Sequence, residues 1–271
     1  VMMGKTNTPE FGAGANTRNR VFGATGNPFD PTLTCAGSSG GSAVALATGM
    51  VPIATGSDYG GSLRTPASFC GVVGFRPSPG TVPSESRVVG LNPFSVLGPM
   101  GRNVGDAALL LAAMTHDDVD DPFGGAIDPD LIEPLEAADP STLRVAVSED
   151  LGCAPVDNNI RRLFGERVNL FRHIFNETQD RDPELGPDLH RSFEILRSVN
   201  FMAAHGERLA NHREKLTPNV ISNTEMGADL SAADVAWAHV EQTAIYRRFN
   251  ALFDEVDILI SPASAVTPFP H

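Results

Sequence analysis

The sequence contains few cysteines and no long apolar run. Its three cysteines include no Cys-x-x-Cys pair, which argues against a disulfide framework and against a structural zinc site. Such sparse cysteine usage fits a reducing compartment, so we expect a cytoplasmic protein. No apolar run reaches the roughly 18 residues that a membrane-spanning helix requires. The sequence therefore predicts neither a secreted disulfide scaffold nor a membrane protein.

Positive charge is also scarce. There are 20 basic against 33 acidic residues, which gives a formal net charge of −13. Nucleic acid and anionic lipid surfaces are negative, so this charge disfavours direct binding to either. Only two of the basic residues are lysines, Lys5 and Lys215. The hydrophobic share of 41% is ordinary for a globular protein and allows a substantial core.

The residues able to do chemistry concentrate between Ala36 and Arg76. Two glycine-rich turns, 37–42 (GSSGGS) and 56–62 (GSDYGGS), flank an apolar run from Ala43 to Ala54. Glycine allows the backbone of such turns to approach a ligand closely. The apolar run predicts a short helix, a break near Pro52 and then a buried extended segment. Both serine turns are therefore expected at one end of a packed core.

This stretch resembles the amidase signature family of serine hydrolases, which share a Ser-Ser-Lys catalytic triad. The family pattern has two adjacent serines between glycine pairs, then G-x-D-x-G-G-S-x-R and P-A-x-F-C-G-x-x-G. Here the pattern is met by Ser38-Ser39, 56–64 and 66–74, and the spacing from Ser38 to Ser62, 62 − 38 = 24 residues, also matches. Further matches extend the resemblance over almost the whole chain, at residues 4–7, 98–107 and 257–262.

The resemblance implies that Ser62 attacks an amide carbonyl, while Ser38, held with a cis peptide bond, passes its proton to a neutral lysine. Such a lysine must be buried to stay uncharged. In the family it lies well upstream of the phrase found here at residues 4–7, so Lys5 does not take this role. Lys215 is expected to be a solvated helix charge. We therefore expect the base to lie outside this sequence, which we interpret as an internal fragment cut at both ends.

The resemblance also implies a set of groups around the nucleophile. The backbone N–H groups of Tyr59, Gly60, Gly61 and Ser62 would form the oxyanion hole, with the Tyr59 ring pointing away. Supporting hydrogen bonds would come from Ser39, Asp58 and Arg64, the last two pairing across the turn. No metal and no organic cofactor are implied.

The fold implied by the resemblance is α/β, with a mixed, twisted sheet covered by helices on both faces. It forms one domain over residues 1–271, truncated at both termini. The residue patterns predict loops over 1–36, a short buried helix from Asp106 to Met114 and an acidic, proline-rich surface connection over 117–141. They also predict strands at 143–147 and 257–261 and helices at 159–175, 193–209 and 232–253, the last capped by Ser231 and Asp234.

Two other interpretations of the glycine-rich turns are weaker. Residues 37–41 also fit the G-x-S-x-G nucleophile elbow with Ser39 attacking, but this requires a strand immediately before, and residues 32–36 follow two prolines closely. Its histidine partner would be one of several residues that are more simply structural: His116, His173, His205 and His239. A phosphate-binding loop is disfavoured because no G-K-[ST] follows either turn. Cys35 and Cys70 are expected to be small buried residues rather than thiol nucleophiles.

By resemblance, the protein hydrolyses a small-molecule carboxylic amide to acid and ammonia or amine through an acyl-enzyme on Ser62. One alternative is the family member that works as the A subunit of a glutamine-dependent tRNA amidotransferase. Its usual Asp-Gln before Gly-Pro is absent here, where residues 94–97 (FSVL) precede Gly98-Pro99. A non-catalytic scaffold is the other alternative, although both Ser38 and Ser62 are present. The identity of the amide and assembly as a homodimer are left open.

Overall fold

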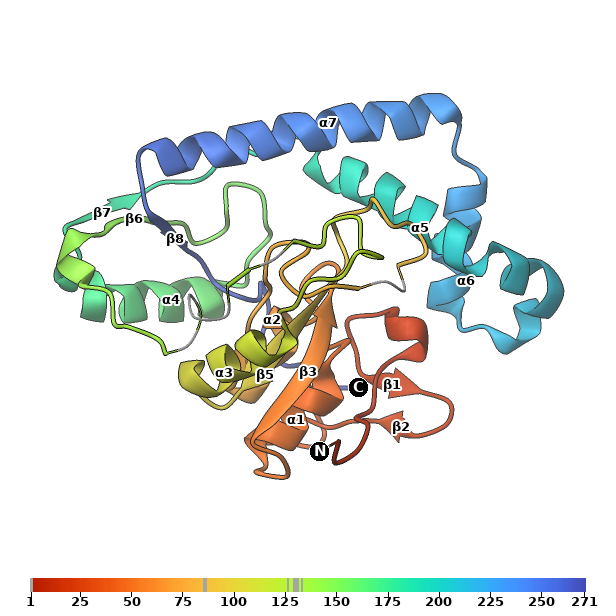
Figure 1. The fold of residues 1–271 in the computed structure, drawn as a ribbon, viewed down its shortest axis with the longest axis horizontal. Helices are drawn as coiled ribbons and strands as arrows, with labels where there is room; N and C mark the ends of the chain where they lie inside the picture. Colours follow the sequence, from red (N-terminus) through yellow and green to blue (C-terminus); the bar gives the residue numbers. More distant parts are fainter. Residues whose placement is uncertain (1, 85–86, 126, 129–131, 133) are drawn as a thin grey trace. The chain divides into compact units, whose positions relative to one another are not determined.

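The computed structural model describes residues 2–84, 87–125, 127, 128, 132 and 134–271. The chain divides into two compact units, residues 1–136 with 268–271 and residues 137–267. Each unit combines helices with a sheet of its own (Figure 1), so the predicted α/β class is confirmed. The single domain over 1–271 stays a prediction, because compact units can also be parts of one domain.

The first unit contains a three-stranded antiparallel sheet. Its strands are β3 (Ile53–Asp58), β4 (Val73–Gly74) and β5 (Val96–Gly101), in the order β3-β5-β4. Strands β3 and β5 pair from Ile53 opposite Gly101 to Asp58 opposite Val96. The ladder therefore ends at Asp58, directly before the turn that carries Ser62.

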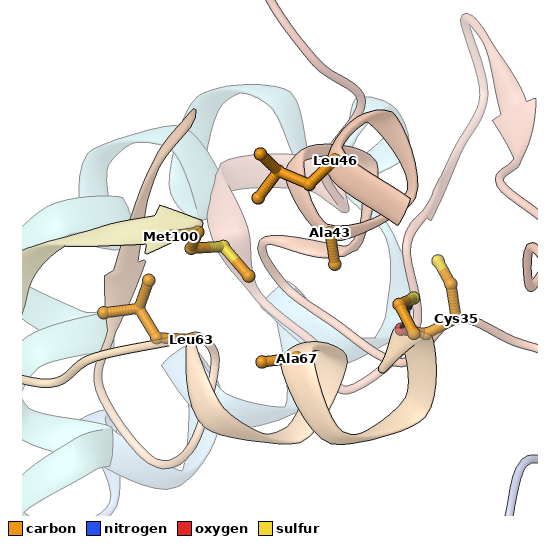
Figure 2. Packing of buried hydrophobic residues seen from close by; sticks show 7 residues of the cluster. Cys35, Ala43, Leu46, Leu63, Ala67 and Met100 are labelled. Atoms are coloured by element: carbon orange, nitrogen blue, oxygen red, sulfur yellow. Dashed lines mark hydrogen bonds between the residues drawn. The ribbon is translucent and has the colours of Figure 1, made fainter. Parts of the chain in front are cut away.

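Two short helices pack on one face of this sheet. They are α1 (Gly40–Ala47) and α2 (Arg64–Cys70). Figure 2 shows their small and aliphatic side chains meeting Met100 of β5 in a buried cluster, whose members are Cys35, Ala43, Leu46, Leu63, Ala67, Cys70 and Met100. Burying a side chain of leucine size contributes about 1.5–3 kcal/mol. The two serine turns are therefore attached to a dry core, as the sequence predicted.

A third helix lies on the opposite face of the same sheet. Gly101 follows Met100 and so faces away from the cluster, and a β-carbon there would lie 2.8 Å from the backbone nitrogen of Ala107. Ala107 belongs to α3 (Val104–Met114), which packs on β5. The predicted helix from Asp106 is confirmed, but it is not buried on most sides, because Leu109 is 55% exposed. Leu109 faces solvent, while buried alanines of α3, such as Ala107, cover the sheet.

The first 36 residues form little regular structure, as predicted. They contain a 3-10 turn, η1 (Glu10–Gly12), and a two-stranded hairpin of β1 (Arg18–Asn19) and β2 (Gly23–Ala24). Residues 117–141 are mostly exposed where the structure describes them, although Asp121 is buried against Arg87 at 2.7 Å. The short 3-10 turn η3 (Pro140–Thr142) lies near the beginning of the second unit.

The second unit contains a parallel sheet with helical cover on both faces. Its strands β6 (Arg144–Val147), β7 (Glu177–Asp180) and β8 (Ile258–Ile260) lie in the order β7-β6-β8. In the central strand, Val145 and Val147 pack with α4 (Asn158–Phe171). Ala146, which points the other way, packs with the 3-10 turn η6 (Leu252–Asp254).

Three further helices complete this unit. They are α5 (Leu189–His212), α6 (Pro218–Ala228) and α7 (Ala232–Ala251), with 3-10 turns η4 (Arg172–Ile174) and η5 (Arg213–Lys215). The predicted capping box of Ser231 and Asp234 is present. Trp237 of α7 packs against α5, with the Arg191 guanidinium 4.2 Å from its ring centroid. No helix of the described residues has both the length and the apolarity to cross a bilayer.

Parallel and antiparallel strand pairs are both present, as expected for a mixed α/β fold, but they are divided among separate sheets. Among the described residues, hydrogen bonding gives three sheets, of which the hairpin and the β3-β5-β4 sheet are antiparallel and the β7-β6-β8 sheet is parallel. The reason lies in the connections, because a helical crossover such as α4 returns the chain in the same direction. Parallel and antiparallel pairs are both present, but in different units.

Candidate active site

The first serine turn leads directly into α1. The peptide bond between Gly37 and Ser38 is cis, as the resemblance implied. Ser38 and Ser39 are each only 4% exposed. At Gly41, a β-carbon would lie 2.4 Å from the backbone oxygen of Asn7, so only glycine lets the segment at residues 4–7 pack on this turn.

Ser39 ties the first turn to the second. Its hydroxyl donates to the backbone oxygen of Ser57 and accepts from the Ser57 N–H, both at 3.2 Å. The backbone N–H of Ser39 donates to the carbonyl oxygen of Ser62, also at 3.2 Å. Ser39 is thus engaged in holding two segments together. This position, and the lack of a strand directly before Ser38 in the described residues, contradict the nucleophile elbow.

Asp58 organises the second turn from inside. Its side chain is 0% exposed, and its carboxylate accepts from the N–H of Gly61 at 2.8 Å and of Leu63 at 3.2 Å. The Arg64 guanidinium donates to both carboxylate oxygens at 3.0 Å, which confirms the predicted pair. Because Gly61 and Leu63 flank Ser62, one carboxylate fixes the backbone on both sides of that serine.

The electrostatics of Asp58 are decided by opposing effects. Burial, the largest of them, raises the pKa of this carboxyl group. The hydrogen bonds and charge of Arg64, together with the N–H groups of Gly61 and Leu63, outweigh burial and lower the pKa from 3.8 to about 2. Asp58 is therefore a permanent anion at neutral pH, and the turn is built around it.

The structure adds Arg76, which the sequence did not identify. Arg76 donates from Nη1 to Asp58 Oδ1 at 3.0 Å and to the backbone oxygen of Asp58, and from Nη2 to the backbone oxygen of Phe94 at 2.9 Å. The Phe94 ring packs against the Tyr59 ring with centroids 5.3 Å apart. Arg76 lies 18 residues from Asp58, too far for a spacing argument to connect them.

The expected oxyanion donors differ in their surroundings. Ser62 is half-buried and Gly60 is exposed, while Gly61 takes a positive φ of 119° that glycine adopts without strain. The Gly61 N–H donates to Asp58. This bond holds the Gly61 peptide in the turn, and the role of Gly61 as an oxyanion donor stays a prediction.

A cavity of about 440 Å³ lies beside the first serine turn. Most of the residues around it carry hydroxyl groups: Thr6, Thr8, Ser38, Ser39, Ser42, Thr55 and Ser57. Thr6 and Ser42 share a hydrogen bond of 2.9 Å. Ser62 does not line the cavity. Its backbone oxygen accepts a hydrogen bond from the N–H of Ser39, which does line it. Such a lining suits a small polar group that donates and accepts hydrogen bonds.

The remaining sequence expectations concern isolated residues. Lys5 is exposed, and Lys215 is exposed in η5. Cys35 and Cys70 are buried as predicted, and burial raises the pKa of both thiols, that of Cys70 to about 12. His116 lies at the end of α3, with Nδ1 3.2 Å from the Met114 oxygen. The described residues contain no cluster of side chains suited to a metal ion.

Comparison with known sequences gives one family. The amidase family matches residues 1–271. The chain is 33% identical to the A subunit of a glutamyl-tRNA(Gln) amidotransferase from Thermobifida fusca, covering 99% of this chain and 59% of that protein. It is 32% identical to a putative amidase, AmiB2, from Mycobacterium bovis, covering 99% of this chain and 56% of that protein. The chain thus spans less than two thirds of the length of these relatives.

Solved structures give the same picture. A bacterial aryl acylamidase of the amidase signature family superposes with a TM-score of 0.91 at 28% identity, over 98% of this chain and 57% of that one. A 6-aminohexanoate cyclic dimer hydrolase complexed with substrate superposes with a TM-score of 0.84 at 25% identity, over 100% and 58%. The predicted amidase-signature fold is confirmed by these similarities.

Proposed function

The chain belongs to the amidase family over its whole length of residues 1–271, and we propose that the protein hydrolyses a carboxylic amide through an acyl-enzyme on Ser62. The observation that carries the proposal is the joining of the two serine turns. Ser39 bonds the backbone of Ser57 and Ser62, which sets Ser38, the residue before it, next to the turn of the nucleophile. No metal or organic cofactor enters the reaction.

In this mechanism the two serines act in sequence. A serine hydroxyl attacks an amide at neutral pH only when a base removes its proton. Ser62 Oγ attacks the carbonyl carbon while its proton passes to Ser38, whose own proton passes to a neutral amine. The protonated amine then returns a proton to the departing nitrogen as the carbon–nitrogen bond breaks. Water releases the acid from Ser62 by the same relay.

The turn supplies the stabilisation of the tetrahedral intermediate. The N–H groups of Gly60 and Ser62 are the proposed oxyanion donors, and the expected donors Tyr59 and Gly61 stay predictions. Asp58, bound to the N–H groups of Gly61 and Leu63, holds the turn in one conformation before substrate arrives. Preorganised donors of this kind contribute about 3–4 kcal/mol each to lowering such barriers.

Neither Lys5 nor Lys215 supplies the amine base, because both side chains are exposed and the base must be buried to stay neutral. We propose that a lysine from outside residues 1–271 places its amine in the hydroxyl-lined cavity beside Ser38. The size of about 440 Å³ accommodates a butylamine-like side chain. Hydroxyl groups there hydrogen-bond the neutral amine, and the absence of a carboxylate among the lining residues avoids favouring its protonated form.

Amine rescue tests this proposal on the chain itself. The chain is incubated with simple aryl and alkyl carboxamides, with and without n-butylamine, and release of the product amine or ammonia is measured. We expect release that depends on n-butylamine and rises with pH as the free amine becomes neutral. Ser62→Ala abolishes this release, whereas Ser68→Ala, a matched change at an exposed serine of α2, leaves it unchanged. Release that persists in Ser62→Ala, or none with any amine, contradicts the proposal.

A second candidate is hydrolysis of glutamine within a tRNA-dependent amidotransferase. The relatives named as the A subunit of that enzyme, including one from Desulforudis audaxviator at 40% identity, favour it. Residues 94–97 favour the stand-alone amidase instead. Glutamine in the same rescue assay separates the two, because a stand-alone amidase is expected to prefer the simple carboxamides.

Location and assembly belong to the same proposal. We propose a cytoplasmic enzyme, which is supported by three cysteines that are all free thiols. Its substrate is a small amide, and a homodimer is the proposed assembly. Sedimentation of the purified chain tests the assembly directly.

A further inference from the structure

We propose that Arg76 is a positioning residue for the nucleophile turn, acting on Ser62 through Asp58 and through the Phe94–Tyr59 ring pair. The inference rests on the proposed function, because it concerns the same turn. Arg76 binds both the carboxylate and the backbone oxygen of Asp58, the residue before this turn, and also the backbone oxygen of Phe94.

The position of Arg76 at the end of the sheet explains why it can do this. Strands β3 and β5 pair as far as Asp58 opposite Val96, where the ladder ends. Arg76 bridges this end of the two strands, since its Nη1 binds Asp58 at the end of β3 and its Nη2 binds the oxygen of Phe94, just before β5, at 2.9 Å. The forked guanidinium therefore continues the ladder by one more link, which a single ammonium group cannot do.

The first route from Arg76 to Ser62 runs through the carboxylate. Arg76 donates to the same oxygen, Oδ1, that accepts from the Gly61 N–H. Its second bond, to the backbone oxygen of Asp58, fixes the peptide that enters the turn. Arg64 also binds this carboxylate, but its side chain is 49% exposed against 23% for Arg76. The more buried cation is the better fixed of the two.

The second route runs through the aromatic pair. The carbonyl that Arg76 holds belongs to Phe94, whose ring meets the Tyr59 ring at 5.3 Å and 45°. Aromatic pairs in this range contribute about 0.5–1.5 kcal/mol beyond the area they bury. Tyr59 is the first residue after β3, so holding its ring restrains the beginning of the turn. The Asp58 carboxylate restrains the end of the turn through the N–H groups of Gly61 and Leu63.

Hydrogen exchange of the full chain tests the positioning role without any need for activity. Arg76→Met removes both bridges, and we expect exchange of the Gly61 and Leu63 amides to become about tenfold faster, the loss expected for a charge-assisted hydrogen bond. Exchange in α5 and the melting temperature stay close to those of the parent chain. Arg76→Lys keeps one cation beside Asp58 but loses the fork, and restores only part of the protection. Arg102→Met, at an exposed arginine after β5, changes nothing and is the matched control.

Labelling kinetics supply the functional readout. With a fluorophosphonate and n-butylamine, Arg76→Met is expected to lower the rate constant of Ser62 labelling about tenfold while leaving the half-saturating probe concentration unchanged. Arg76→Lys is expected to recover part of that rate. Unchanged exchange in Arg76→Met overturns the inference, as does a uniform rise across the whole chain. If Ser62 is not labelled in the parent chain even with amine, the proposed function fails, and exchange alone still decides the role of Arg76.

Discussion

Asp58 is a charged group that the protein buries completely and then satisfies with five donated hydrogen bonds. Its carboxylate oxygens accept from the N–H groups of Gly61 and Leu63 and from two arginines. A buried carboxylate without such partners would take up a proton instead. At the scale of single residues, the candidate site therefore depends on an anion that serves as the fixed centre of a turn.

The depressed pKa of Asp58 predicts a specific loss of stability in acid. The folded-state pKa of about 2 lies below the ordinary value of 3.8, so the stabilisation is full above pH 4 and is lost as pH falls toward 2. The difference corresponds to about 2 kcal/mol. Chemical denaturation of the parent chain and Asp58→Asn across this range measures it.

The comparison of the two chains isolates this one group. Asp257 also has a pKa lowered to about 2, through its hydrogen bonds with Arg144, and it titrates in both chains equally. The difference in unfolding free energy between parent and variant is expected to shrink by about 2 kcal/mol as pH falls from 4 to 2. A constant difference would show that the pKa of Asp58 is not depressed.

Sequence reasoning succeeded for local pairs and missed the distant one. Asp58 and Arg64 are six residues apart, and the turn between them brings them together. Arg76 reaches the same carboxylate only because α2 and β4 fold back between them. The bond from the Gly61 N–H to Asp58 was also missed, because it depends on a positive φ that no residue pattern reveals.

At the scale of elements, close packing of backbone on backbone holds the first serine turn. The segment at residues 4–7 lies against α1 at Gly41, where a β-carbon would meet Asn7 nitrogen at 2.5 Å and Asn7 oxygen at 2.4 Å. Neither atom belongs to a side chain that can rotate away. Accommodating a methyl group therefore requires a backbone shift.

Substitution of Gly41 tests this contact. Gly41→Ala is expected to lower the unfolding free energy by about 1–3 kcal/mol, the usual cost of overpacking, and to displace residues 4–7 from α1. Denaturant unfolding measures the first effect, and protease sensitivity near Asn7 measures the second. A fully stable Gly41→Ala chain would mean that the segment at residues 4–7 does not pack on α1. Gly165→Ala, where a β-carbon meets nothing within 4 Å, is the matched control.

Elements with strong periodicity were predictable, and elements made by tertiary pairing were not. Helices α4, α5 and α7 and strands β6 and β8 were found close to their predicted places. Strand β5 was missed because its sequence, VLGPMG, contains two glycines and a proline, and pairing with β3 overrides those weak propensities. Helix α6 was missed for a similar reason, since its asparagines and glycine are poor helix formers and its packing on α5 supplies the stability.

At the scale of the whole molecule, the two units differ in the elements and functional residues that they contain. The first contains both serine turns, and the second contains the parallel sheet and the long helices. Their cysteines are distributed unequally, with Cys35 and Cys70 buried in the first unit and Cys153 half-buried in the second. Burial raises the pKa of all three thiols.

This distribution predicts the thiol reactivity of the intact chain. A thiol reagent is expected to modify Cys153 in the folded protein, and Cys35 and Cys70 only after unfolding, because the latter are 0% and 1% exposed. Titration with a chromogenic disulfide reagent in buffer and in denaturant counts the two classes. Rapid reaction of Cys35 or Cys70 in the native protein would contradict the packed core of Figure 2.

Identification of the modified serine tests the central claim most directly. The chain is treated with a fluorophosphonate in the presence of n-butylamine, and the labelled peptide is located by mass spectrometry in the parent and in Ser39→Ala. We expect label on Ser62 in both chains, more slowly in Ser39→Ala because its bonds to Ser57 are lost, and none in Ser62→Ala. Label on Ser39 would restore the nucleophile elbow, and no label under any condition would contradict an activated serine in this turn.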